Sequence, residues 1–515
     1  MNILLIHSYV ATNHPSPLLT EPLGLIALAT YLESFYGDTI SVEILDLFAL
    51  GFGKVYKKKD KYIMGIHDRE SIASLLQENP PDLIGITCNF TAYSEDSFEL
   101  SKTIKSIYPS IPVVIGGAHV TMYPVETLEN NPDVDIVVCG EGEITFQKLV
   151  DELLNKNTKS LGKIEGLCYR RPDGTIHFTG KRDLIHDINE LPTPDRKFIN
   201  NDVYKKVNKV ALPFTKKVPA GSIMTSRGCP FSCIFCSTKV MWERKWRPLS
   251  AEKVIKEIET MVLVYGFHEI VIQDDQFVLD KNRVHQICDF LITKKLNISL
   301  SIPPGTCVWI LNENLLAKMK KAGFYRLNFP IETGNENTLK FIRKPVNLEK
   351  TRETIQIANR LGFWTQGNFI IGFPYETREE MMETINYAYE CGLDYANFLI
   401  ATPLAGSEMT EIFIKEGLIE SGINTSDVFH ADHDTTTMTG NELNEIHAQA
   451  VRGFVSNKIF FYLNPINFYK HMLPKLLTLD GIVYAMKVLK VTFTDIVIQR
   501  LKGNVSQVIP VKSDH

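Results

Sequence analysis

The chain has 515 residues, enough for roughly two to four domains, and its 44% hydrophobic and 22% charged residues are typical of soluble globular proteins. A net charge of −5 disfavours a general nucleic-acid-binding surface, so we expect no nucleic-acid partner. No segment reaches the ~18 uncharged apolar residues of a membrane span. The N-terminal "MNILLIHSYV" has too short an apolar run for a signal peptide, and we expect a cytoplasmic protein.

Residues 1–160 alternate between short apolar runs and helical patterns. Strand-like runs such as "NILLI", "DLIGIT" and "PVVIGG" are separated by amphipathic stretches such as "LGLIALATYLESF" and "SFELSKTIKSI". About five such repeats predict an α/β domain with a doubly wound parallel sheet of the Rossmann-like kind. Ligands of such sheets bind at the carboxyl ends of the strands.

Three loops rich in small residues are expected at that edge of the sheet. They are "TCNFTAY", "GGAHVTMYP" and "CGEGE", and they contain Gly116, Gly117, Gly140 and Gly142. Glycine lets a backbone approach a ligand closely and expose its N–H groups. Any one of these loops can be a simple tight turn, but three on one edge indicate a binding face.

A hairpin and a linker are expected in residues 161–217, where "IEGLCYRRPDGTIHFTG" carries a Pro-Asp-Gly turn. A second strand–helix series then begins near Ser222. Its predicted strands are "SIMTS", "EIVIQD", "LSIP", "RLNFPIE", "GNFIIGF" and "YANFLIA". About six repeats over residues 218–420 predict a partial (β/α)6 barrel, whose chemistry is expected at the carboxyl ends of the strands.

The loop after the first barrel strand, "SRGCPFSCIFCSTK", places Cys229, Cys233 and Cys236 in a C-x-x-x-C-x-x-C pattern. A structural zinc site needs four ligands, and no second cysteine or histidine pair follows in the expected spacing. The nine cysteines are an odd number, and most lie singly, which argues against a disulfide framework. A [4Fe-4S] cluster with one open iron fits three thiolates better.

This pattern resembles the radical S-adenosylmethionine enzymes over residues 218–420. The supporting motifs are "IETGNE", "GNFIIGFPYET" and "ATPLAGSEM". The N-terminal third resembles cobalamin-binding domains, with "EPLGLIALATYL", "GGAHVTMYP" and "GEGE" in matching order. Together the two parts are similar to the cobalamin-binding radical S-adenosylmethionine family, which includes methylases of unactivated carbon and an anaerobic porphyrin-ring cyclase.

The resemblance implies three cofactors: a [4Fe-4S] cluster, S-adenosylmethionine and cobalamin. Each of the three cysteines is expected to bind one iron, and the fourth iron is expected to take the methionine moiety. An electron from an external donor, such as flavodoxin or ferredoxin, then generates a 5′-deoxyadenosyl radical. The expected substrate is a small molecule, with a lipid-like or an anionic compound allowed.

The same resemblance assigns further cofactor contacts in the barrel. Phe235 is expected beside the adenine, although core packing is an equal alternative. Asp274 and Asp275 stand where many relatives have a Gly-Gly-Glu motif for the methionine amine, and a helix cap or ion pair is their alternative. Glu332 is expected to contact ribose or amine, and Asn368 lies on the strand expected beside the adenine.

In the first domain, the resemblance assigns cobalamin contacts to the glycine loops together with His119 and Glu141. None of the 13 histidines has an aspartate two residues before it, so the D-x-H-x-x-G motif that supplies a cobalt ligand is absent. We expect His119 to accompany the corrin ring without ligating cobalt.

Residues 421–515 are expected to be helical. From Val451 to His515 there are nine Lys/Arg and three Asp/Glu, a local charge of +6, with interleaved aromatic residues. Such a tail is suited either to peripheral membrane contact or to reception of a lipid-like or anionic substrate. The alternative is a helical cap that closes the open barrel.

The expected reaction is methylation of an unactivated carbon, with a non-methylating cyclisation or oxidative rearrangement as the alternative. A methylthiotransferase resembles this architecture but carries a second cluster on N-terminal cysteines, and "IHSYVATNHP" has none. A non-catalytic cobalamin or redox sensor would not need an open iron at a barrel mouth.

Overall fold

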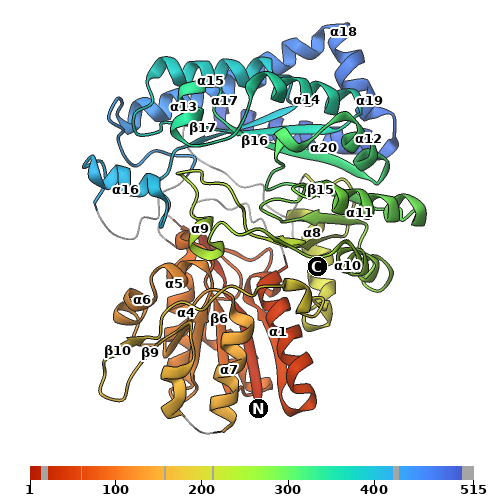
Figure 1. Cartoon of the computed structure of the whole chain (residues 1–515). Coiled ribbons are helices and arrows are strands. Elements are labelled where there is room, and N and C mark those ends of the chain that lie inside the picture. The colour runs from red at the N-terminus through yellow and green to blue at the C-terminus, as the bar shows by residue number, and fades with distance from the viewer. Residues whose placement is uncertain (13–20, 59–60, 156–157, 212–213, 421–427, 502–515) are drawn as a thin grey trace. The chain divides into compact units, whose positions relative to one another are not determined.

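The computed structural model describes residues 1–12, 21–58, 61–155, 158–211, 214–420 and 428–501 (Figure 1). The chain divides into two compact units, one of residues 1–212 together with the end of the chain from Ile498, and the other of residues 213–497. Parts of the expected C-terminal region, 421–427 and 502–515, lie outside the described residues.

The N-terminal unit is built on a seven-stranded sheet with the order β10-β9-β8-β7-β6-β1-β3. Its five parallel strands run in the spatial order second, first, third, fourth, fifth, as in doubly wound sheets. The predicted α/β class is therefore confirmed. The strands are β1 (Asn2–His7), β3 (Ser41–Asp46), β6 (Leu83–Thr87), β7 (Val113–Gly116), β8 (Ile136–Val138), β9 (Leu167–Arg170) and β10 (Ile176–Phe178).

Helices cover both faces of this sheet because successive strand residues point to opposite sides. Ile84 and Ile115 pack in a core with α3 and α4, whereas Leu5 and Val114 pack in another with α1 and α7. The helices of the unit are α1 (Leu23–Tyr36), α2 (Leu47–Leu50), α3 (Arg69–Glu78), α4 (Ser94–Ile107), α5 (Ala118–Met122), α6 (Pro124–Asn130), α7 (Gly142–Leu154) and α8 (Asn201–Ala211).

The expected hairpin is present and extends the main sheet, since β9 pairs antiparallel with β8 and β10 pairs with β9. A separate antiparallel sheet joins β2 (Val10–Thr12), β4 (Val55–Lys58) and β5 (Lys61–Met64). The sequence did not predict this small sheet. Its strands are only three or four residues long, and β4 and β5 carry lysine and tyrosine, so the sheet lacks a clear apolar alternation.

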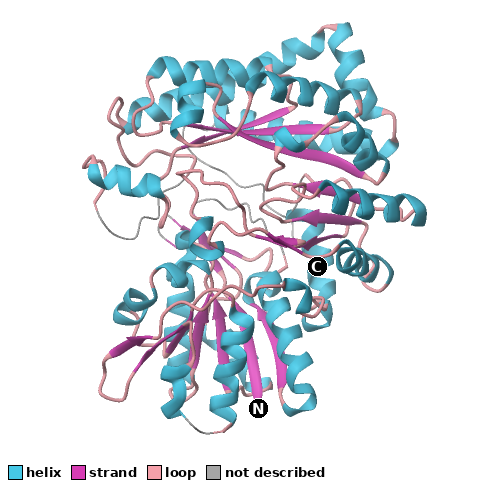
Figure 2. Ribbon diagram, viewed as in Figure 1, coloured by secondary structure: helices cyan, strands magenta, loops and turns pink. Residues whose placement is uncertain are grey.

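The second unit contains six parallel strands in chain order, which confirms the predicted partial barrel (Figure 2). They are β11 (Ala220–Ile223), β14 (Glu269–Ile272), β15 (Ser299–Ile302), β16 (Phe324–Glu332), β17 (Trp364–Ile371) and β18 (Tyr395–Ile400). The helices between and after them are α9 (Thr238–Trp242), α10 (Ala251–Leu263), α11 (Lys281–Lys294), α12 (Glu313–Lys321), α13 (Glu336–Phe341), α14 (Leu348–Arg360), α15 (Arg378–Glu390) and α16 (Glu408–Lys415). Ser250 caps α10 by accepting the N–H of Lys253.

The C-terminal region is helical, as predicted. It comprises α17 (Gly440–Leu463), α18 (Pro465–Asn467), the π-helix η7 (Phe468–Met472), α19 (Leu473–Leu476) and α20 (Leu479–Leu501). A buried ion pair fixes it to the barrel, because Lys475 contacts Asp394, which directly precedes β18, at 2.5 Å. Within the described ranges, no helix combines the length and the apolar character that a bilayer crossing requires.

Candidate functional site

The cysteine loop leaves the barrel at the carboxyl end of β11 and is closed by a short antiparallel pair. This pair joins β12 (Ser226–Arg227) and β13 (Arg247–Pro248). Gly228 begins the loop with φ of +86°, and a Cβ there would lie 2.2 Å from the carbonyl oxygen of Lys245. Only glycine fits this position, so the spacing between strand and cysteines depends on it.

The three cysteines of this loop are half-buried free thiols. Burial raises the pKa of Cys229 to about 11, and the neighbouring charges of Cys236 and Cys233 add to the effect. The hydroxyl of Thr238 lies 3.1 Å from the sulfur of Cys236 and can donate to a thiolate there. The charges of these thiols therefore act on one another within one half-buried loop.

Among the described residues, no three His, Cys, Asp or Glu side chains converge on one metal ion. A four-iron cluster does not require such convergence, since each thiolate binds a different iron. An all-thiolate donor set on a loop at the barrel mouth fits the cluster chemically.

Asp274, at the end of β14, fixes the start of the cysteine loop. Its carboxylate accepts the N–H of Thr225 at 2.5 Å and the hydroxyl of Ser226 at 2.6 Å, and the side chain is fully buried. Arg283 donates to the carbonyl oxygen of Thr225 at 2.7 Å and adds its charge beside Asp274. Asp274 therefore anchors the start of the loop, and its carboxylate oxygens accept hydrogen bonds from donors of the protein itself.

Asp275, one residue further, is only half-buried, and its charge acts on Cys229. Burial, followed by the charge of Asp274, raises the pKa of Asp275 to about 6. No hydrogen bond within the described part of the chain holds this carboxylate. Of the two predicted aspartates, Asp275 is thus the one that remains available to a ligand.

A buried ion pair lies close enough to Cys233 of the cysteine loop for its charges to act on that thiol. Lys344 contacts Glu332 at 2.8 Å, and both side chains are 8% exposed. Burial lowers the pKa of Lys344, but the charges of Glu332 and Cys233 outweigh burial and raise it to about 12. Lys344 is therefore a positive charge that acts on the thiol of Cys233.

The sequence prediction included Glu332 but missed Lys344, which lies 12 residues away in a loop. The only signal for it was a basic pair before proline in "IRKP". Glu332 itself has φ of +70°, and the register of β16 against β17 shifts between Pro330 and Glu332. A left-handed backbone is uncommon for a residue other than glycine and concentrates at functional sites.

Phe235 and Asn368 are both partly accessible. The ring of Phe235 lies 6.1 Å from that of Phe373, and the ammonium of Lys344 lies 5.8 Å from its centre. On β17, Asn368 accepts a hydrogen bond from the amide of Asn397 at 3.1 Å. Phe235 therefore joins the cysteine loop to the loop after β17, while Asn368 stands on the strand that leads to it.

The three predicted loops of the N-terminal unit meet at one edge of its sheet. A Cβ on Gly117, which has φ of +122°, would lie 2.5 Å from the carbonyl oxygen of Cys88 in the neighbouring loop. Gly116 precedes it at the end of β7, and the N–H of Gly140 donates to Thr121 at 2.9 Å. The three loops thus form one interlocked surface at the carboxyl ends of β6, β7 and β8.

His119 is almost fully buried in this surface, where it contacts Thr91 at 3.1 Å and packs near the rings of Phe98 and Tyr123. Burial lowers its pKa to about 4, so the imidazole is neutral at physiological pH.

In the third loop, Glu141 accepts the N–H of Ile185 at 2.7 Å and so anchors the segment after the hairpin. Gly140 has φ of +74°, and a Cβ there would meet no atom within 4 Å. Gly142, which begins α7, has similarly open surroundings. This edge therefore offers exposed backbone and free space, the features that a large flat ligand needs.

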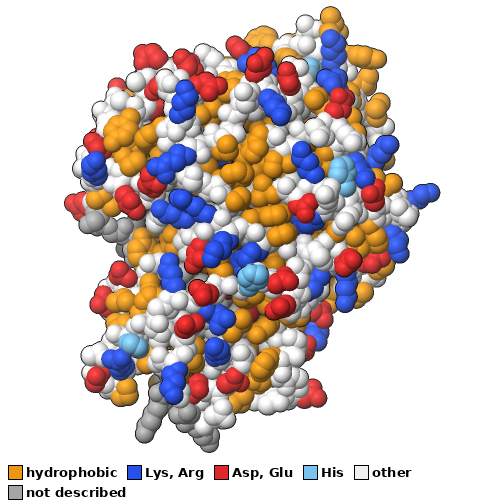
Figure 3. Space-filling model, viewed as in Figure 1, with side chains coloured by type: hydrophobic (Ala, Val, Ile, Leu, Met, Phe, Trp, Pro, Cys, Tyr) orange, Lys and Arg blue, Asp and Glu red, His pale blue; other side chains and the backbone are white. Residues whose placement is uncertain are grey.

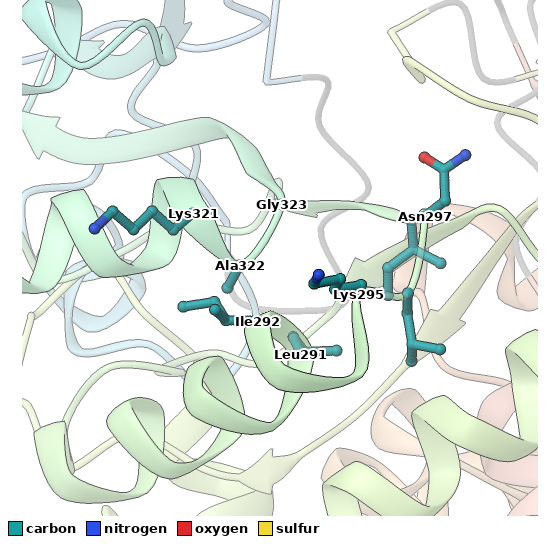
Figure 4. Close-up of a pocket in the computed structure, with 9 residues that line it drawn as sticks. Leu291, Ile292, Lys295, Asn297, Lys321, Ala322 and Gly323 are labelled. Carbon is teal, nitrogen blue, oxygen red and sulfur yellow. The ribbon is translucent and has the colours of Figure 1, made fainter.

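A shallow hollow of about 340 Å³ lies at the opposite end of the barrel (Figure 4). Leu291 and Lys295 from the end of α11 and Lys321 with Gly323 before β16 line it. It adjoins the amino ends of β15 and β16, whereas the cysteine loop follows the carboxyl end of β11. The hollow is therefore not part of the site.

Comparison with known proteins matches both units separately. Residues 223–388 match the Radical SAM superfamily, and residues 11–150 match the B12 binding domain. A solved structure titled as the cobalamin-dependent S-adenosylmethionine radical enzyme OxsB, with aqua-cobalamin and S-adenosylmethionine bound, has the same fold. The alignment with this structure has a TM-score of 0.67 at 17% sequence identity, and it covers 98% of this chain and 82% of the OxsB chain.

Three curated proteins extend the similarity. "Uncharacterized methyltransferase PH0819" from Pyrococcus horikoshii is 37% identical over 77% of this chain and 79% of its own length. Cytidylyl-2-hydroxyethylphosphonate methyltransferase from Streptomyces wedmorensis is 32% identical over 81% and 82%. An anaerobic magnesium-protoporphyrin IX monomethyl ester cyclase from Rubrivivax gelatinosus is 29% identical over 66% and 59%. On these grounds the chain belongs to the family of cobalamin-dependent radical S-adenosylmethionine enzymes.

Proposed function

We propose that this enzyme methylates an unactivated carbon of a small molecule. One observation carries the proposal. The cysteine loop at the mouth of the barrel is flanked by a free carboxylate, Asp275, and by the buried pair of Lys344 and Glu332. The methionine ammonium of S-adenosylmethionine needs a negative charge beside the open iron, and the free carboxylate of Asp275 supplies one.

In this proposal, Cys229, Cys233 and Cys236 hold the [4Fe-4S] cluster. When bound, the cluster supplies an electron for cleavage of S-adenosylmethionine, and cobalamin supplies a carrier for the methyl group. Thr238 donates a hydrogen bond that stabilises the thiolate of Cys236. The buried anchor at Asp274 keeps the loop closed onto the barrel, which limits access of water to the reacting atoms.

Two side chains are proposed to orient S-adenosylmethionine. Asp275 accepts the methionine ammonium, because its carboxylate has no protein donor among the described residues. Phe235 contacts the adenine with its partly exposed ring. Glu332 and Lys344 stay paired and present a net neutral, rigid polar wall beside Cys233.

Cobalamin is proposed to lie on the interlocked edge of the N-terminal sheet. Gly116, Gly117, Gly140 and Gly142 line that edge, and the open surroundings of Gly140 and Gly142 fit a corrin ring. His119 supports the edge from within as a neutral side chain. Glu141 positions its loop through Ile185 and is a supporting residue in this proposal.

The substrate class and the electron donor are also proposals. We favour an anionic small molecule, since the Streptomyces wedmorensis relative is named for a phosphonate, and phosphonates are anionic. A lipid-like substrate is the other class that the sequence allowed. A flavodoxin or ferredoxin is the proposed external donor, because the cluster must be reduced once for each cleavage.

The test uses S-adenosylmethionine with a trideuterated methyl group, hydroxocobalamin without a methyl group, a chemical reductant and panels of phosphonates and lipids. We expect 5′-deoxyadenosine and a product that gains the labelled methyl group. The Cys233→Ala enzyme is the matched control and should yield neither compound. Labelled product from that variant at the wild-type rate would contradict the proposal.

A non-methylating cyclisation is the second candidate. The Rubrivivax gelatinosus relative, named as a cyclase, supports it. The same assay separates the two reactions. Formation of 5′-deoxyadenosine with a dehydrogenated or cyclised product and no labelled methyl group would select the second candidate.

A further inference from the structure

The outer side of the C-terminal helices carries an unusual number of exposed large apolar residues. We call this side the C-terminal apolar face, and its members are between 57% and 77% exposed. They are Ile459, Phe460, Leu463, Ile466, Tyr469, Leu477, Leu479, Met486 and Leu489. Exposed apolar surface that gathers over consecutive helices marks an interaction site.

The helices that carry the C-terminal apolar face are already packed against the barrel through their other side. The same helices bury other residues against the barrel, and Phe454 and Tyr484 are 3% and 2% exposed. Tyr484 packs on the rings of Tyr325 and Trp364, and Lys475 closes its ion pair with Asp394. The orientation of the helices is therefore fixed by these contacts, and the apolar face remains outside.

Basic residues accompany the face. Between residues 451 and 490 there are six Lys/Arg and a single acidic residue, Asp480, which pairs with Lys217 at 3.8 Å. Lys458 and Lys475 are buried, but Arg452, Lys470 and Lys490 are exposed. Hydrophobic and basic side chains lie side by side along the upper right edge of Figure 3.

We propose that the C-terminal apolar face docks onto an anionic lipid surface. Leucine, isoleucine and phenylalanine side chains enter the interface between headgroups and acyl chains, and tyrosine suits the headgroup level. The exposed basic residues are attracted to anionic headgroups. A second copy of this chain fits less well, because two identical faces would bring like charges together. The inference does not depend on the proposed reaction.

The test measures co-sedimentation of the full-length protein with vesicles. One set contains phosphatidylcholine with phosphatidylglycerol, and the other contains phosphatidylcholine alone. We expect binding to the anionic vesicles that weakens at least tenfold when salt rises or when the neutral vesicles replace them. The Lys470→Glu/Lys490→Glu variant should lose this preference.

The Leu477→Ser/Leu479→Ser variant tests the apolar part, since both side chains are more than 70% exposed and removing them leaves the core intact. We expect at least tenfold weaker binding to anionic vesicles with an unchanged melting temperature. Leu263→Ser/Val264→Ser is the matched control, because this pair is 69% and 70% exposed at the end of α10. It should bind as the wild type does.

Three results would overturn the proposal. They are absence of binding to anionic vesicles, equal binding by the two double-serine variants, and a dimer in solution that Leu477→Ser/Leu479→Ser dissociates. The last result, read by light scattering, would assign the face to a second copy. A failure of the methylation assay leaves all of these measurements unaffected, so the two proposals fail separately.

Discussion

Replacing Asp274 with asparagine tests whether this buried carboxylate anchors the cysteine loop. The change converts one accepting oxygen into an amide that faces the hydroxyls of Thr225 and Ser226 or the N–H of Thr225. It also removes the negative charge beside the buried guanidinium of Arg283. A lost hydrogen bond at a buried charged group costs about 1–3 kcal/mol, and an unpaired buried charge costs more.

We expect Asp274→Asn to destabilise the second unit by about 3 kcal/mol, a fall of roughly 6–12 °C in its melting temperature. Differential scanning calorimetry of the apoprotein measures this change. Asp275→Asn is the matched control, since it removes an adjacent, half-buried carboxylate and relieves repulsion with Asp274. Its melting temperature should stay within about 2 °C of the wild type. Equal melting temperatures for the two variants would refute the anchoring role.

Three further predictions concern cofactor binding and pH. In the cluster-loaded enzyme, Asp275→Asn should weaken S-adenosylmethionine binding about tenfold by isothermal titration calorimetry. The wild-type affinity should fall below pH 6, because the carboxylate of Asp275 is then protonated. A wild-type affinity that does not change with pH would contradict this role of Asp275. Electron paramagnetic resonance of Co(II)-cobalamin should show no axial nitrogen splitting, and splitting lost in His119→Ala would make that residue a ligand. Burial raises the pKa of Glu376 to about 8, so this group's stability contribution is fully present below pH 4.5 and is lost as pH rises through 8. Glu376→Gln should remove about 4 kcal/mol of that dependence in melts from pH 5 to 8.5, and parallel curves for both proteins would exclude it.

The strands of the barrel were predictable because each one is a compact apolar run between helical patterns. The segments "EIVIQD" and "GNFIIGF" illustrate this, and both form buried strands, β14 and β17. The strand order also follows from the sequence, because consecutive strand–helix units place neighbouring strands in parallel. The α/β class could therefore be predicted from these strand and helix patterns alone.

The contacts between loops were less accessible to prediction. Asp274 and Asp275 are adjacent and chemically identical, and only three-dimensional burial separates the anchor from the free carboxylate. Lys344 approaches Glu332 because the chain turns back after α13, and no periodic pattern records such a return. The orientation of the C-terminal helices could not be predicted for the same reason, because the ion pair of Lys475 and Asp394 joins residues that are 81 positions apart in the sequence.

The most direct test of the account is iron and sulfide analysis of the anaerobically reconstituted enzyme together with its electron paramagnetic resonance after reduction. The wild type should contain about four irons and four sulfides per chain and give the signal of a reduced [4Fe-4S] cluster that changes when S-adenosylmethionine is added. Cys233→Ala should lose the cluster while it keeps cobalamin, because the two cofactors are assigned to different units. Stoichiometric zinc without iron in the wild type, or an intact cluster in Cys233→Ala, would contradict the account.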